Sequence, residues 1–238
     1  MMEPGPGPHA TPTQAGERGA ALALLPIAAT LDFYALPAAL QEQTLVQFAP
    51  QILAYLAFGL WATQNRSIAS RLGLEQRNIG KGLRWGLPTG LLLGCLNSVV
   101  ILSISPSLGY DIAFLTSTPH AQLPIFIMIP WFICLIALFV EINFRGFMLG
   151  RLLSWGRQLL GPKLSPLARA IALGISAITF AFDPFMVNTF QHLHWIALWD
   201  GLIWGIIWLR TNNLYATIIA HAVEVLVMYC AIRATLMP

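Results

Sequence analysis

A few ionisable side chains stand inside long apolar stretches of this chain, where a charge is costly. They are Asp32, Glu141, Arg145, Asp183, Asp200, His221 and Glu224. A charged side chain at the centre of a membrane span costs at least about 2.5–3.5 kcal/mol, so each of these residues needs a structural or chemical reason. Carboxyl groups and imidazoles are also the groups that act as general acids and bases or bind metal ions.

Glu141 and Arg145 stand four residues apart, with the acid on the N-terminal side. This order and spacing favour an ion pair on one helix face. Two interpretations remain open: the two side chains neutralise each other, or Glu141 is a general base or metal ligand that Arg145 orients.

His221 and Glu224 lie one helical turn apart. At a rise of about 1.5 Å per residue, Glu141 lies about 15 Å from Arg151, and His221 about 16 Å from Arg210. If the two helices touch, these acids and this histidine share one polar pocket at similar depth. Asp183 and Asp200 are two further candidate carboxylates for that pocket.

The composition places all these residues in a membrane protein. Only 23 of 238 residues are charged, 57% are hydrophobic, and the three cysteines sit in apolar runs that predict buried thiols. The mean hydropathy is +0.68, and a soluble domain carries about 25% charged residues. A nucleic-acid-binding protein, a disulfide-stabilised secreted domain and a cytosolic enzyme are therefore excluded.

Apolar stretches of about 20 residues, the length that crosses a bilayer, recur along the chain. They predict an all-α, polytopic transmembrane helix bundle of about seven spans, with six or eight as alternatives. The predicted spans are residues 19–40, 44–63, 85–104, 123–149, 167–187, 193–209 and 213–235. The predicted domains are a disordered tail (1–18), N-terminal transmembrane helices (19–70) and a membrane core (71–238).

The basic residues predict the orientation of this bundle. Twelve of the 13 lysines and arginines fall in segments that would lie on one side of the membrane, and only Arg233 falls on the other. Because basic loops stay in the cytoplasm, the N-terminus is expected to be cytoplasmic and the C-terminus to lie outside. In a bacterium the membrane would be the cytoplasmic one.

Three segments, taken in order, resemble the CPBP family of intramembrane metalloproteases, which groups CAAX-processing and bacteriocin-immunity (Abi) proteins. Residues 71–83 are similar to the LGL segment that precedes the core of that family. Residues 140–152 are similar to its EExxxRGxL motif, and residues 201–221 to the block that ends in its third-motif histidine. The resemblance implies a CAAX-protease-like helical fold and an intramembrane endopeptidase.

The resemblance also implies that the first motif glutamate and a second-motif histidine activate a water molecule. A third-motif histidine and asparagine would then bind the oxyanion, or a metal ion. In this chain the corresponding positions are Val140, Pro184 and Val225, while Glu141, Arg145 and His221 remain. Valine and proline have no side-chain group that could take a proton or bind a metal.

These replacements predict a pseudoprotease that serves as a binding, assembly or immunity-type subunit. The alternative is an active endopeptidase with a rearranged site. Glu141, His221 and Glu224 would be its candidate metal ligands, with Asp183 beside them; carboxylates and imidazole suit zinc or iron. A weaker third possibility is an ion-coupled transporter that depends on Asp32, Asp200 and Glu224. The expected partners are the lipid bilayer and a membrane protein or peptide substrate, with no nucleic acid.

Overall fold

The computed structural model describes residues 17–237, which fold into helices without a strand. The α-helices are α1 (Leu24–Ala35), α2 (Ala38–Gln41), α3 (Thr44–Gln47), α4 (Ala49–Gln64), α5 (Ile68–Leu72), α6 (Ile79–Val99), α7 (Ser105–Ser107), α8 (Pro119–Gln122), α9 (Ile125–Ile127), α10 (Ile133–Glu141), α11 (Gly150–Leu160), α12 (Ser165–Ala181), α13 (Pro184–Phe190), α14 (Ile196–Thr211) and α15 (Leu214–Leu236). Three π-helical segments, η3 (Val100–Ile104), η5 (Met128–Phe132) and η6 (Ile142–Leu149), join neighbouring α-helices. Short 3₁₀ turns are η1 (Ala20–Ala23), η2 (Gln76–Asn78), η4 (Ala113–Ser117), η7 (Pro162–Leu164) and η8 (Gln191–Leu193). The all-α fold predicted from the sequence is confirmed.

Three continuous helical runs are long and apolar enough to cross a membrane: Ile68–Ser107, Ile125–Leu160 and Leu214–Leu236. A fourth is possible if Ser165–Ala181 and Pro184–Leu193, which meet at a bend of 49°, form one broken span. The predicted number of seven spans is therefore not confirmed. Helices α4 and α14 are apolar but have 16 residues each, about 24 Å of helix, against a bilayer core of about 30 Å.

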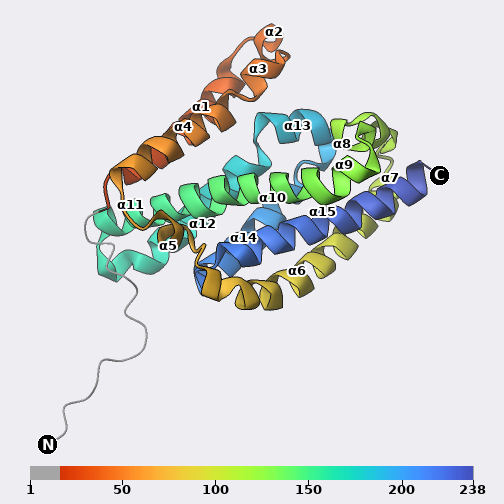
Figure 1. The fold of residues 1–238 in the computed structure, drawn as a ribbon. Helices are drawn as coiled ribbons and strands as arrows, with labels where there is room; N and C mark the ends of the chain where they lie inside the picture. Colours follow the sequence, from red (N-terminus) through yellow and green to blue (C-terminus); the bar gives the residue numbers. More distant parts are fainter. Residues whose placement is uncertain (1–16, 238) are drawn as a thin grey trace, which may run out of the picture.

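Helices α6 and α15 pack side by side over most of their length (Figure 1). Glycines at every fourth position of α6 make this close approach possible: Gly82, Gly86, Gly90 and Gly94. A Cβ atom added at Gly90 would lie 2.5 Å from the carbonyl oxygen of Ala220. Small residues at such spacing let transmembrane helix backbones approach closely, and this packing sets Asn97 of α6 beside Glu224 of α15.

The run from α10 through η6 to α11 passes through the middle of the bundle (Figure 1). Its side chains Phe144 and Phe147 enter the main core, together with Trp61 and Trp204. Helix α14 packs on α12 because Gly201 lies against Ala177, where an added Cβ would be 3.1 Å from Cα. Gly205, one turn further along α14, lies against Leu173 of α12 in the same way, so both glycines serve this packing.

Helices α1 and α4 pair into a hairpin whose far end, with α2 and α3, projects from the bundle (Figure 1). Large apolar side chains on it are exposed, including Leu31 and Leu56, as lipid contact would require. The three cysteines, Cys95, Cys134 and Cys230, are also exposed. The prediction of buried thiols was wrong, because helix surfaces that face lipid are as apolar in sequence as those that face the core.

Residues 1–16 of the predicted tail lie outside the described residues, but its last two residues make contacts. The carboxylate of Glu17 is fully buried. It pairs with Arg151 and accepts hydrogen bonds from Trp61 Nε1 (2.9 Å) and Ser154 Oγ (2.6 Å). Arg151 lies 4.2 Å above the Trp61 ring. Through this ion pair and these hydrogen bonds, the start of the described chain contacts both α4 and α11.

Candidate functional site

Glu141 ends α10, and the π-helical segment η6 begins at the next residue. Glu141 is fully buried, and its Oε1 accepts a hydrogen bond from Arg145 Nη1 at 3.0 Å. The guanidinium of Arg145 lies 4.5 Å from the ring centre of Phe180 and 4.9 Å from that of Trp204. The predicted pair on one helix face is therefore a buried ion pair enclosed by aromatic rings, and π-helical turns are frequent at functional sites.

His221 reaches the same carboxylate from α15, since its Nδ1 lies 3.0 Å from Glu141 Oε1. The imidazole stacks on Trp204, with ring centres 4.4 Å apart and planes 21° apart. No described residue hydrogen-bonds the other ring nitrogen, Nε2. Glu141 thus fixes the orientation of the imidazole, and the prediction that Glu141 and His221 meet is supported by this geometry.

His221 lines a cavity of about 590 Å³, which we call the central cavity. Three carboxyl side chains also line it, those of Asp183, Asp200 and Glu224, while Glu141 and Arg145 are not among its lining residues. Most of the remaining wall is apolar and aromatic. The pocket carboxylates named from the sequence therefore share one cavity, with the Glu141–Arg145 pair adjoining it through His221.

Asn97 joins two of these carboxylates. Its Nδ2 lies 3.2 Å from each oxygen of Asp200 and 2.7 Å from Glu224 Oε1. Its Oδ1 accepts a hydrogen bond from Trp199 Nε1 at 3.0 Å. Asn97, Asp200 and Glu224, which we call the acidic cluster, come from three helices, α6, α14 and α15, and all are buried.

Asp183 lies apart from the acidic cluster and has its own partners. It precedes α13, and its Oδ1 accepts hydrogen bonds from the Phe185 backbone N–H (3.1 Å) and from Gln51 Nε2 (2.9 Å). The first of these bonds caps the N-terminus of α13. Capping gives Asp183 a structural role, although it also lines the central cavity.

The positions where the resemblance calls for catalytic side chains are apolar at this site. Val140 and Val225 both line the central cavity. Pro184 is buried as the first residue of α13, beside Asp183. Val140 faces the cavity while the adjoining Glu141 does not, because consecutive residues of an α-helix point about 100° apart.

The residues present do not fit a zinc or iron ion. Among residues 17–237, no group of three or more histidine, cysteine, aspartate or glutamate side chains has the arrangement of a metal site. The predicted ligands Glu141, His221 and Glu224 are therefore not gathered as a ligand set. Glu141 Oε1 is instead engaged by Arg145 and His221.

Asp32, also singled out from the sequence, is exposed on α1 and does not line the central cavity. The sequence did not lead us to predict Asn97 or Trp204 as residues of the site. Asn97 carries an amide in an otherwise apolar stretch, and that signal could have found it. No sequence signal marks Trp204 among the eight tryptophans.

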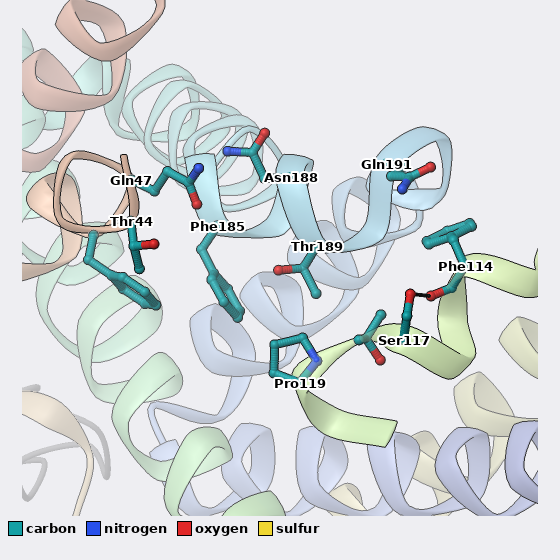
Figure 2. A pocket seen from close by; sticks show the side chains of 11 residues that line it. Thr44, Gln47, Phe114, Ser117, Pro119, Phe185, Asn188, Thr189 and Gln191 are labelled. Carbon is teal, nitrogen blue, oxygen red and sulfur yellow. Dashed lines mark hydrogen bonds between the residues drawn. The ribbon is translucent and has the colours of Figure 1, made fainter. Parts of the chain in front are cut away.

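A smaller pocket of about 320 Å³ adjoins the central cavity, since Phe48, Thr118 and Phe185 line both. Figure 2 shows Thr44 and Gln47 on one side of it, facing Asn188 and Thr189 of α13. Its lining is more polar than that of the central cavity.

His120, which precedes the Ile125–Leu160 run, also lines the central cavity. Its ring packs against Phe132 and Phe190, with centres 5.4 and 5.6 Å apart. Burial among these rings lowers the pKa of His120 to about 4, because it disfavours the charged imidazolium.

Comparison with known proteins identifies one family. Residues 122–227 match the family model described as Type II CAAX prenyl endopeptidase Rce1-like. No curated protein and no solved structure matches the chain. The matched segment runs from α8 into α15 and contains Glu141, Arg145, His221 and all three replaced positions.

Proposed function

We propose that this chain is a pseudoprotease. Residues 122–227 match the model of the Rce1-like CAAX endopeptidase family. This match confirms the resemblance seen in the sequence and supports an integral membrane protein. In this proposal the chain keeps the membrane scaffold and the central cavity of a protease and uses them for binding. Its role is that of an accessory, assembly or immunity-type subunit that holds a membrane-embedded ligand or partner.

The observation that carries this proposal is the apolar character of the cavity wall at Val140 and Val225. Loss of a general base lowers a rate about 10²–10⁴-fold, and loss of an oxyanion donor lowers it a further 10²–10³-fold or so. Glu141 does not replace the missing base, because Oε1 is shared between Arg145 and His221 and the residue does not line the cavity.

The cavity itself suits a binding role. Ligand pockets in proteins hold about 300–1,000 Å³ and have mostly apolar walls with a few polar groups. The central cavity, with about 590 Å³, has both properties. The basic residues of the sequence further support a cytoplasmic N-terminus and, in a bacterium, a location in the cytoplasmic membrane.

One observation favours a second candidate, an active endopeptidase. His221 is held by Glu141 through Nδ1, and its Nε2 has no partner among the described residues while the ring lines the cavity. A histidine oriented in this way could take a proton from a water molecule, with Glu141 stabilising the imidazolium that forms.

A cleavage assay separates the two candidates. The purified protein, in lipid nanodiscs, is incubated with a prenylated peptide that ends in a CAAX sequence, and mass spectrometry measures release of the C-terminal fragment. The pseudoprotease proposal expects no release above that of His221→Ala. Release by the wild type that His221→Ala abolishes would contradict it and support the endopeptidase.

A further inference from the structure

The acidic cluster contains two buried carboxyl groups without a cationic partner. Asp200 is 4% exposed and Glu224 is 1% exposed. Within residues 17–237, neither forms an ion pair: Arg145 pairs with Glu141, and Arg233, at another part of the cavity wall, donates to the Tyr229 hydroxyl at 3.3 Å. Two buried carboxylates this close to each other are strongly unfavourable without compensation, so the cluster must either share a proton or bind a cation.

Glu224 also has an atom free to receive such a charge. Its Oε1 accepts a hydrogen bond from Asn97, but its Oε2 is buried and has no hydrogen-bond partner among the described residues. Both Glu224 and Asp200 line the central cavity. A buried acceptor without a partner costs about 1–3 kcal/mol, and more when it is charged, so a donor in the cavity would be bound favourably.

The surroundings decide which kind of cation fits. The described residues offer no set of three ligating side chains for a metal ion. The wall beside the cluster is instead apolar, with Ile101, Met228 and Val225 among its residues. An organic cation satisfies both parts of such a site, because its nitrogen donates to the carboxylates while its hydrocarbon part covers the apolar wall.

We propose that the central cavity binds an amphiphilic primary amine, with the ammonium group on Glu224 and Asp200 and the hydrocarbon chain along the apolar wall. This inference rests on the proposed function, because it uses the cavity for binding and not for hydrolysis. Asn97 is a positioning residue in this site: its amide holds both carboxyl groups in place from α6.

The test compares hexylamine, which is positively charged at pH 7, with 1-hexanol, which has the same chain length and no charge. The full-length protein is placed in nanodiscs of a zwitterionic lipid, and ligand-observed NMR measures binding relative to empty nanodiscs. The first variant is Glu224→Gln, which keeps the size of the side chain and an oxygen that can accept the hydrogen bond from Asn97. The second is Asp32→Asn, which removes an exposed carboxylate outside the cavity.

The wild type and Asp32→Asn are expected to bind hexylamine at least tenfold more tightly than 1-hexanol. Glu224→Gln should lose this preference while still binding 1-hexanol, which shows that it is folded. Equal affinity for the two probes in the wild type would overturn the proposal and would mean that the two carboxyl groups share a proton. An unchanged preference in Glu224→Gln would also overturn it. Neither result bears on peptide cleavage, which the assay with His221→Ala tests separately.

Discussion

The Nδ1 atom of His221, on α15, lies 3.0 Å from Oε1 of Glu141, at the end of α10. The two residues are 80 positions apart in the chain, and the contact links the segment that resembles the family's first motif with the one that resembles its third. The same oxygen accepts from Arg145, so one carboxylate orients both a histidine and a guanidinium.

Glu141→Gln is expected to lower the free energy of unfolding by about 3–5 kcal/mol, because it leaves the buried Arg145 guanidinium without its counter-charge. Thermal and denaturant unfolding in detergent, followed by tryptophan fluorescence, measures this loss. The double variant Glu141→Gln/Arg145→Met, which removes the orphaned charge, should recover part of it. A double variant no more stable than Glu141→Gln would contradict the ion-pair explanation.

The buried ion pair between Glu17 and Arg151 of α11 predicts a similar loss of stability. Arg151 is 3% exposed, so Glu17→Gln leaves a buried cation unpaired and should destabilise the protein by about 3–5 kcal/mol. The matched control is Glu75→Gln, which breaks the exposed pair with Arg77 and should leave the unfolding transition nearly unchanged. Equal effects of the two substitutions would show that burial of the Glu17 pair is not what matters.

The glycine contacts between α6 and α15 predict a position-dependent effect of one methyl group. Gly90→Ala would place Cβ 2.5 Å from the Ala220 carbonyl oxygen, whereas a Cβ at Gly80 meets nothing within 4 Å. Overpacking of this kind costs about 1–3 kcal/mol, so Gly90→Ala should unfold at lower denaturant than Gly80→Ala. If both variants are as stable as the wild type, the two helices are not packed this closely.

How far the sequence predicts the site depends on distance along the chain. The Glu141–Arg145 pair follows from spacing within one helix. Similar depth in the membrane allows Glu141 to meet His221 only if their two helices touch, and the sequence did not establish that contact. Asn97 was missed because its partners Asp200 and Glu224 are 103 and 127 positions away, and helical periodicity does not say which helix lies opposite. The α6 glycines were the available signal for the α6–α15 contact.

The number of spans was less predictable, for a reason visible in α13. The apolar stretch 167–187 reads as one helix, but Asp183 and Pro184 end α12 and start α13 at a 49° bend. Asp183 caps the new helix, and proline suits its first turn. A hydropathy average does not detect this break, because Asp183 and Pro184 are only two residues in a long apolar stretch.

His120, whose partly buried ring packs against Phe132 and Phe190, predicts a dependence of stability on pH. Its folded pKa of about 4 lies below the ordinary value of 6.5, so between these values the unfolded chain binds a proton that the folded protein does not. Stability should therefore fall as the pH drops from about 6.5 to about 4, by up to roughly 3 kcal/mol. In unfolding experiments, His120→Phe should lose this part of the dependence, with no difference in slope from the wild type between pH 7 and 8. An identical slope at pH 4–6.5 in both proteins would contradict the burial of a neutral ring.

The most direct test of the pseudoprotease proposal compares protein termini across the membrane proteome of host cells that make the wild type, Glu141→Gln or His221→Ala, at matched protein levels. The account predicts the same set of termini in all three. A set of new termini that is present with the wild type and absent with both variants would contradict it and identify the protein as a working intramembrane endopeptidase.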